Sequence, residues 1–454
     1  KIHRKLRWDL NHIVNYTIPY QPYPLTEFLR FGSGWERFYF ESDQSPLAIA
    51  GLGITAQISR TDPNRFTSLS QDLREFFQRV TLLNDSDDSP IGARPVLLGG
   101  GSFFAEMEPG EWDSFPQAAL VLPHYALIRA NSRYTFSVNL ELTGTETIAS
   151  ASRRARMEAE TFLSQLESAI LPTPSIPDEI TTNETSRVIW QNTIRDSVEM
   201  IHQGELKKVV MARPVQVNGN RSIDVPALLE SLGKSCPSCF RFLFEFSPMT
   251  IFAGATPERL VSVSGAKFTT AAIAGSIHRS DFPAEDEALG QQLIESQKDQ
   301  SEHSFVKDEI CARLENLVAS LQVDAAPRLL RLPNIQHLWT HIEGTLHPNQ
   351  SVLDLVAALH PTPAVGGVPG EAALQLIHQL EGFERGWYAG PVGWVDADGN
   401  GDFVVAIRSG LFRGDTATLF GGAGIVADSD PDKEWEETGL KIHFLLNAMQ
   451  AELV

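Results

Sequence analysis

Cysteine is scarce in this sequence, with 3 residues in 454. Two of them, Cys236 and Cys239, form a CPSC pair, but no second pair has zinc-site spacing and no thioredoxin-like pattern surrounds them. We therefore expect a structural role for both. So few cysteines in a chain of this length make no disulfide framework, which indicates a reducing compartment.

Long apolar runs and basic charge are also lacking. No segment supplies about 18 uninterrupted apolar residues, which argues against a membrane-spanning helix. The 37 Lys and Arg against 57 Asp and Glu give a net charge of −20, whereas a nucleic-acid-binding protein has a basic surface. We therefore expect neither a membrane nor a nucleic acid as partner. An acidic protein that acts on an anion must gather positive charge at its binding site, from lysine, arginine or a metal ion.

Four basic residues lie close together at the start of the chain: Lys1, Arg4, Lys5 and Arg7. This pattern fits either a processed transit peptide or an arbitrary start, and the sequence leaves both open. The predicted location is the bacterial cytoplasm or, after removal of a transit peptide, the plastid stroma. We expect a monomer or a weak homo-oligomer.

The first part of the chain predicts a largely antiparallel sheet. Between residues 38 and 142, short apolar or alternating runs are separated by Gly, Pro and Asn. The glycines at 99–101 precede no helix pattern, so we expect a turn or bulge there rather than a nucleotide-binding loop. A helix is predicted over 148–171. Residues 172–186, rich in Pro, Thr and Ser, have the composition of a linker.

Two adjacent lysines occur in the strand predicted over 206–217, which follows a helix predicted over 187–202. Because side chains alternate along a strand, either Lys207 or Lys208 must point where apolar residues point. A buried lysine loses hydration, its pKa falls, and it becomes available as a base. The alternative, a solvated edge for both lysines, stays open.

Carboxylates follow in segments that carry no decisive pattern. Glu258 comes after a Thr-Pro turn, a position where most glutamates are solvated. A single long helix is predicted over 285–321. On it, Glu295 and Glu302 share a face that is either a charged outer surface or a source of a metal ligand.

A strand with two histidines and a rigid loop precede the C-terminal segment. His337, Thr340 and His341 lie on the strand, and the histidines lack HxxxH-type spacing, so packing or solvation is the commoner role. The Pro/Gly-rich loop at 358–373 ends at a helix. It is a candidate wall for a pocket.

The segment 403–441 combines groups that suit a small, multiply charged anion. One apolar strand ends in Arg408, and a second leads into the glycine-rich stretch 421–424. Asp430–Pro431 has the cap and first-turn chemistry of a helix start. Three charged side chains then project from one helix face: Glu434, Glu437 and Lys441. An arginine, backbone amides and two carboxylates would hold an anion partly through a hard metal ion.

These motifs resemble those of the chorismate-utilising enzymes, which include isochorismate synthase, salicylate synthase and the large chains of anthranilate and aminodeoxychorismate synthases. The matching blocks run in family order from about Trp190 to the C-terminus: KKVVMAR, FAGATPERL, AIAGS, SQKDQSEH, IQHLWT, LHPTPAVGG, RGWYAGPVGW, VVAIRSG and FGGAGIVADSDPDKEWEETGLK. The N-terminal part matches only in general character.

The resemblance implies an α+β fold of two stacked, mostly antiparallel sheets with helices outside and the site between them. Residues 1–186 would form the N-terminal part of the sheet framework and 187–454 the catalytic part, within one integrated domain. Mg²⁺ would join the substrate carboxylate to Glu302, Glu434 and Glu437. Other residues implied in substrate binding are Gly275, Ser276, Thr340, Tyr388, Arg408, Gly422, Gly424 and Lys441.

The branch of the family is indicated by a few side chains. Ammonia-using members typically carry Gln where this chain has Lys208, and aminodeoxychorismate synthases typically carry a nucleophilic Lys where it has Ala274. Lys208 and Glu258 therefore resemble the acid–base pair of isochorismate synthases. In that reaction Lys208 would remove a proton from the water that attacks C2 of chorismate, and Glu258 would protonate the hydroxyl that leaves C4.

Salicylate synthase, which makes isochorismate and then eliminates pyruvate, is the alternative. The extended N-terminal part and the RGWYAGPVGW block favour isochorismate synthases of menaquinone or phylloquinone biosynthesis. A non-catalytic relative that keeps the fold would have lost at least one key residue. None of these is lost: Lys208, Glu258, Glu302 and Glu434.

Overall fold

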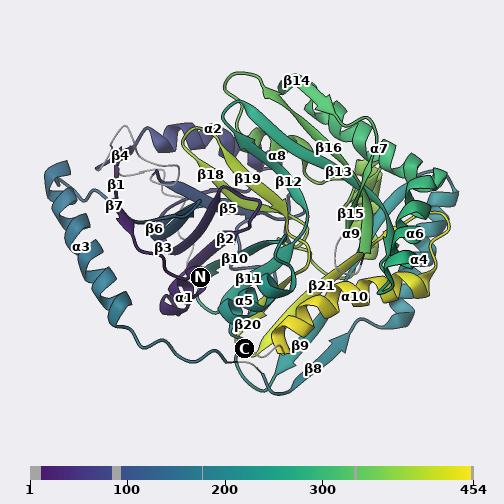
Figure 1. Ribbon diagram of the computed structural model, residues 1–454, viewed down its shortest axis with the longest axis horizontal. Coiled ribbons are helices and arrows are strands. Elements are labelled where there is room, and N and C mark those ends of the chain that lie inside the picture. The colour runs from purple at the N-terminus through teal and green to yellow at the C-terminus, as the bar shows by residue number, and fades with distance from the viewer. Residues whose placement is uncertain (1–11, 84–93, 176, 332–334, 451–454) are drawn as a thin grey trace.

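The computed structural model describes residues 12–83, 94–175, 177–331 and 335–450. These ranges contain ten helices and 21 strands (Figure 1). The basic residues noted at the start of the chain lie outside them. Among the helices described, none combines the length and the apolar character needed to cross a bilayer.

Strand β6 (Ala118–Ala130) joins two arms of one hydrogen-bonded sheet. Along one edge it pairs with β3 (Leu47–Arg60), and along the other its first half pairs with β5 (Val96–Gly101) and its second half with β7 (Arg133–Glu141). Strand β7 continues to β1 (Ile13–Tyr20), which pairs in parallel with β4 (Val80–Leu82). Every other strand pairing in the described ranges is antiparallel.

The first arm continues from β3 and the second from β5. In order of hydrogen bonding, the first arm consists of β2 (Arg37–Glu41), β10 (Phe240–Ser247), β11 (Thr250–Thr256), β20 (Ser409–Arg413), β21 (Thr416–Ile425) and β9 (Lys208–Gly219), with β8 (Ile180–Glu184) and β17 (Gly367–Val368) on β9. The second consists of β18 (Pro391–Asp396), β19 (Gly401–Val405), β12 (Arg259–Ser264), β13 (Lys267–His278) and β16 (Ile335–Leu346), with β14 (Val318–Val323) and β15 (Arg328–Arg331) on β16.

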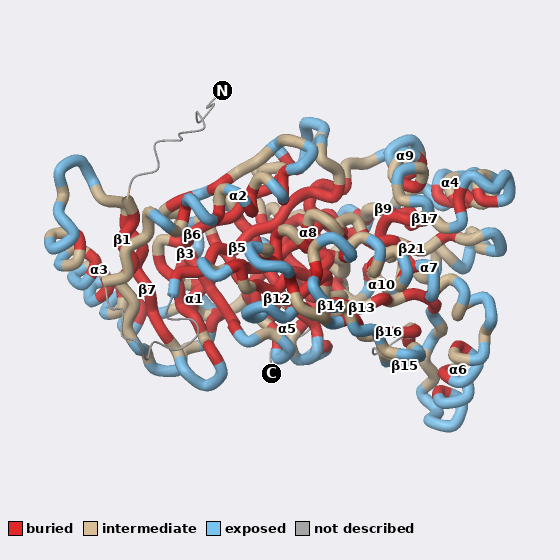
Figure 2. The backbone as a smooth tube through the Cα atoms, turned by 90° about the horizontal axis from the view of Figure 1, so that it is seen from above, coloured by how far each residue is buried: buried red, intermediate tan, exposed pale blue. Residues whose placement is uncertain are grey.

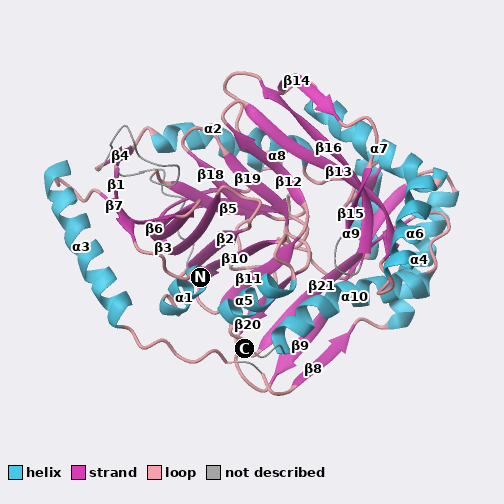
Figure 3. Ribbon diagram, viewed as in Figure 1, coloured by secondary structure: helices cyan, strands magenta, loops and turns pink. Residues whose placement is uncertain are grey.

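The two arms stack across a shared apolar core, as the buried strands in the middle of the molecule show (Figure 2). A second core lies under α1 (Leu25–Phe31), α3 (Ile148–Ser168), α5 (Val225–Ser235) and α10 (Pro431–Gln450). The other helices are α2 (Arg65–Phe77), α4 (Arg187–His202), α6 (Pro283–Glu295), α7 (Gln297–Leu314), α8 (Val352–Leu359) and α9 (Gly370–Leu380) (Figure 3). The predicted fold of two stacked, mostly antiparallel sheets flanked by helices is confirmed.

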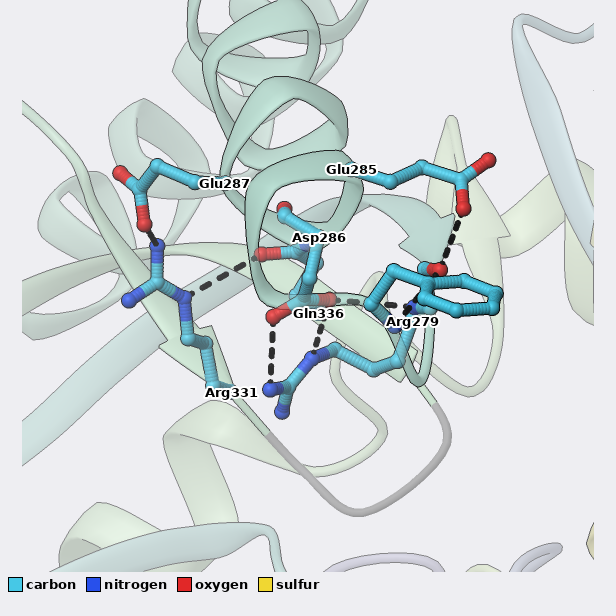
Figure 4. Close-up of polar contacts among 8 residues, drawn as sticks. Arg279, Glu285, Asp286, Glu287, Arg331 and Gln336 are labelled. Atoms are coloured by element: carbon cyan, nitrogen blue, oxygen red, sulfur yellow. Dashed lines mark hydrogen bonds and ion pairs between the residues drawn. The ribbon is translucent and has the colours of Figure 1, made fainter.

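The long helix predicted over 285–321 is wrong, because the chain forms α6, α7 and then β14. The side chain of Ser296 accepts a hydrogen bond from the amide of Asp299 and so begins a new helix. A polar cluster attaches the first turn of α6 to the sheet (Figure 4): Arg279 pairs with Asp286, whose carbonyl accepts from Gln336.

Three further expectations need correction. The linker predicted over 172–186 contains β8, which adds an edge strand to β9. The glycines at 99–101 end β5 rather than form a turn, and a Cβ at Gly100 would lie 2.2 Å from the carbonyl oxygen of Pro391. Cys236 and Cys239 form a disulfide at the C-terminus of α5, which the cysteine count did not predict.

Candidate active site

A cavity of about 320 Å³ lies between the free ends of the two arms. Strands β9 and β21 form one wall, β13 and β16 another, and α7 and α10 contribute charged side chains. The cavity brings together all the predicted site residues except Thr340: Lys208, Glu258, Gly275, Ser276, Glu302, Tyr388, Arg408, Gly422, Gly424, Glu434, Glu437 and Lys441.

Strand β9 begins at Lys208, so Lys207 lies just before the strand, and the two lysine side chains point in different directions. Lys208 points into the cavity, where its Nζ donates to Glu302 Oε1 on α7 at 2.9 Å. The Nζ of Lys207 instead lies 3.9 Å from the ring centroid of Phe305. Lys208 is therefore the lysine that faces the cavity.

Glu258 enters the cavity from the turn between β11 and β12. Its amide donates to Thr256 Oγ1 at 3.2 Å, which fixes the turn. Burial raises the pKa of Glu258 to about 7, although the positive charges of Lys208 and Lys441 act in the opposite direction. Near neutral pH this carboxyl group can therefore either hold or release a proton.

Helix α10 presents two carboxylates and a lysine to the cavity. Asp430 caps the helix by accepting from the amide of Lys433 at 3.0 Å, as the sequence predicts. Lys441 Nζ donates to Glu437 Oε1 at 2.6 Å and to the carbonyl oxygen of Gly422 at 2.9 Å. Although burial of Glu437 acts to raise its pKa, the charge and hydrogen bond of Lys441 bring the pKa below its usual value.

The predicted metal ligands have the chemistry of a magnesium site but are not gathered around one point. Within the described ranges, no three His, Cys, Asp or Glu side chains are close enough to hold a metal ion. Glu302 and Glu437 are paired with lysines. Burial, with the neighbouring charge of Glu437, raises the pKa of Glu434 to about 7. A divalent cation would offset this unfavourable buried charge, and carboxylates are the ligands that Mg²⁺ prefers, so the chemistry of the three residues suits the ion.

Arg408, Gly422 and Gly424 also line the cavity. Arg408 adopts a left-handed backbone conformation (φ 52°) between β19 and β20, and no carboxylate in the described part of the chain forms an ion pair with its half-buried side chain. A Cβ at Gly422 would lie 3.0 Å from Tyr388 Oη, and one at Gly424 would lie 3.0 Å from Lys208 Cε. These glycines therefore leave room for two of the side chains that line the cavity.

Thr340 is not at the cavity. It is buried on the other face of β16, where its Oγ1 lies 2.6 Å from His303 Nε2. His337 lies three residues earlier on β16, and its side chain therefore points to the opposite face and lines the cavity. Its Nδ1 lies 2.7 Å from Ser276 Oγ. Burial and the nearby cations lower the pKa of His337 to about 4, which keeps the ring neutral. Period-two alternation could have separated the two residues from sequence.

Comparison with known proteins identifies the family of this chain. The family described as chorismate binding enzyme matches residues 2–450. The chain belongs to this family. This chorismate binding enzyme is 30% identical in sequence to isochorismate synthase MenF of Bacillus subtilis (strain 168), and the alignment covers 98% of this chain and 95% of that protein. It is 34% identical to the salicylate biosynthesis isochorismate synthase of Pseudomonas aeruginosa (strain PAO1), over 94% and 88%.

Two solved structures have the same fold as this chain. The menaquinone-specific isochorismate synthase MenF from Escherichia coli superposes with a TM-score of 0.80 at 25% identity, covering 97% of this chain and 95% of that chain. Anthranilate synthase component I from Streptococcus pneumoniae superposes with a TM-score of 0.71 at 20% identity, covering 89% and 93%. The second likeness concerns the fold alone.

Proposed function

We propose that this chain is an isochorismate synthase, an isomerase that interconverts chorismate and isochorismate. The observation that carries the proposal is that Lys208, from β9 of the first arm, and Glu258, from the turn that joins β11 to β12 of the second arm, enter one cavity beside Arg408. Relatives named isochorismate synthase that align with nearly the whole chain support the same activity. The likeness to a menaquinone-specific enzyme favours that pathway.

Arg408 and Lys441 would bind the substrate carboxylates. The guanidinium of Arg408 suits bidentate pairing, and its lack of an ion pair within the described residues leaves it available to a ligand. Tyr388, His337 with Ser276, and the backbone at Gly275, Gly422 and Gly424 would enclose the rest of the molecule.

Lys208 would take a proton from water as the water attacks C2, and Glu258 would give its proton to the hydroxyl that leaves C4. A pKa of about 7 suits Glu258 to the role of acid near neutral pH. The base role requires a neutral amine, so Lys208 must release the Glu302 carboxylate to which it donates here.

Glu302, Glu434 and Glu437 would hold Mg²⁺. When bound, the ion supplies positive charge that anchors a substrate carboxylate. The two paired carboxylates, Glu302 and Glu437, would exchange their lysine partners for the ion.

A product assay tests the proposal. Purified protein is incubated with chorismate and MgCl₂, without ammonia or glutamine, and the products are separated by chromatography with a coupled assay for pyruvate. Isochorismate in equilibrium with chorismate, and no pyruvate, is the expected result. Stoichiometric pyruvate with salicylate would identify a salicylate synthase. Product only after addition of ammonia would contradict the role of Lys208, and chorismate binding without product would identify a non-catalytic relative.

A further inference from the structure

A buried ion pair lies behind the cavity wall, outside the set of lining residues. Glu381 follows α9, and Arg385 lies in the loop before β18. Arg385 Nη2 is 2.5 Å from Glu381 Oε1, and Nε is 2.7 Å from Oε2, so the pair is bidentate. The side chains are 1% exposed for Arg385 and 3% for Glu381.

The ion pair makes hydrogen bonds with the backbone of β9 that a neighbouring strand would otherwise make. On this edge β17 pairs only with Lys208 and Val209. Beyond the end of β17, the amide of Ala212 donates to Glu381 Oε1 at 2.6 Å, and the carbonyl oxygen of Val210 accepts from Arg385 Nη2 at 2.7 Å. Buried backbone groups need such partners. The two side chains therefore continue the hydrogen bonding of β9 where no strand is present.

Arg385 also connects two other walls of the cavity. Its Nη1 donates to the carbonyl oxygen of Val365 in the Pro/Gly-rich loop at 3.0 Å, and its own carbonyl accepts from the amide of Tyr388 at 2.9 Å. Val210, Val365 and Tyr388 all line the cavity. The guanidinium thus joins β9 to the Pro/Gly-rich loop, and the backbone of Arg385 joins both to the segment that carries Tyr388.

Stability alone does not explain why charges occupy this position. Removing two charges from water is costly, and an apolar pair of similar volume is often as stable as a buried ion pair. An apolar pair, however, cannot bond to the backbone of β9 and of the loop at the same time. The chemistry of the pair therefore suits the fixing of geometry.

We propose that Glu381 and Arg385 are positioning residues that fix β9, and with it Lys208, relative to Glu258 and the bound substrate. This inference rests on the proposed function for its kinetic test. It requires no contact between the ion pair and the substrate.

The kinetic test replaces the pair by Glu381→Leu with Arg385→Met. The matched control is Arg37→Met with Glu245→Leu, a pair on β2 and β10 that is also buried, 2.5 Å apart and bonded to backbone at Leu29 and Met249. Neither control residue lines the cavity. We expect kcat per folded molecule to fall about 100-fold, since small misplacements have effects of that order, with a smaller change in KM. The control should keep kcat.

Equal kcat for the two double variants, after correction for the folded fraction, would overturn the proposal. If Glu381→Leu/Arg385→Met does not fold, Arg385→Lys replaces it. Lysine keeps the charge beside Glu381 but cannot reach the carbonyl oxygens of Val210 and Val365 together. A folded Arg385→Lys protein should also lose kcat, and an unchanged kcat would refute the positioning role.

Hydrogen exchange separates this inference from the proposed function. In Arg385→Lys the amides of Val210 and Ala212 should exchange with solvent at least about tenfold faster, because the hydrogen bonds on this edge of β9 are weakened. The exchange rates of the β10 amides should stay unchanged. If the wild-type protein makes no isochorismate, the proposed function fails and the exchange rates still decide the inference. Unchanged exchange at both amides would overturn it.

Discussion

The space between the two arms is filled by rings in one region and by charges in another. In the aromatic region, defined by Trp112, Phe115, Phe252 and Trp387, ring centroids lie 5.3–6.3 Å apart, mostly edge to face. At the free ends of the arms, lysines, carboxylates and an arginine surround the cavity. Of the four rings only Phe252 lies on a strand, and the cavity takes its side chains from strands, helices and turns, so the two regions differ in backbone as well as in side chains.

The boundary between these regions is narrow. Trp387 belongs to the aromatic region and is fully buried, whereas the adjacent Tyr388 lines the cavity. Substitutions in the aromatic region should therefore change stability and spare the chemistry, and substitutions at the cavity should do the reverse.

The largest effect is expected from Lys208→Ala. Removal of the base should lower kcat by about 10²–10⁴-fold while chorismate binding and the melting temperature stay close to those of the wild type. Steady-state kinetics with calorimetric titration of chorismate measures both. The control is Lys207→Ala, which alters the residue just before β9, whose side chain does not line the cavity. Near-normal turnover of Lys208→Ala would remove Lys208 from the base role.

Phe252→Ala should have the opposite signature. Phe252 is fully buried among Trp112, Phe115 and Phe242. Its truncation should lower the free energy of unfolding by about 3–5 kcal/mol, measured by urea denaturation, with little change in kcat of the folded protein. A large loss of kcat at full folding would show that the two regions are not separable.

The pH dependence should report Glu258. The acid must be protonated, and the protonated form is lost as the pH rises through a pKa of about 7. We therefore expect kcat/KM to fall about tenfold per pH unit well above pH 7, when Mg²⁺ is saturating. A rate that still rises between pH 8 and 9 would exclude Glu258 as the acid.

A lower pH should weaken the activation of the enzyme by Mg²⁺. Glu434 is increasingly protonated as the pH falls below its pKa of about 7, and a metal ligand must be deprotonated. The Mg²⁺ concentration for half-maximal activity should therefore be several-fold higher at pH 6 than at pH 8. An unchanged requirement in a titration at both pH values would argue against Glu434 as a ligand.

The smallest effect is expected from Thr340→Val. Loss of the hydrogen bond to His303 should lower the free energy of unfolding by about 1 kcal/mol, with unchanged KM for chorismate. Thermal denaturation and kinetics check this pair of outcomes. A marked rise in KM would return Thr340 to the substrate-binding set, against its place on the far face of β16.

Local signals in the sequence were reliable where one residue type decides the structure. The cap at Asp430 and the shared face of Glu434, Glu437 and Lys441 were predicted because capping and helical spacing act within a few residues. The ordered motif blocks also predicted the fold correctly, through the family resemblance. The break at Ser296 was missed because its cap lies within a charged helical pattern that continues on both sides.

Contacts between distant segments could not be derived from the sequence. Lys208 and Glu302 are 94 positions apart, and only the folded sheet brings them to 2.9 Å. The same holds for the bonds of Arg385 to Val210 and of Glu381 to Ala212. Helix α2 lies in a region where only strands were predicted, and β8 forms because β9 offers it an edge.

The junction at β6 has a mechanical consequence for the cavity. Because β6 is hydrogen-bonded to both arms, their separation is constrained most strongly beside it. The strands that border the cavity are the last in each arm and therefore the farthest from this constraint along the ladder. The hydrogen bonds that join the arms close to the cavity, from Val405 to Glu258 and from Arg385 to Val210, therefore decide how widely the site can open.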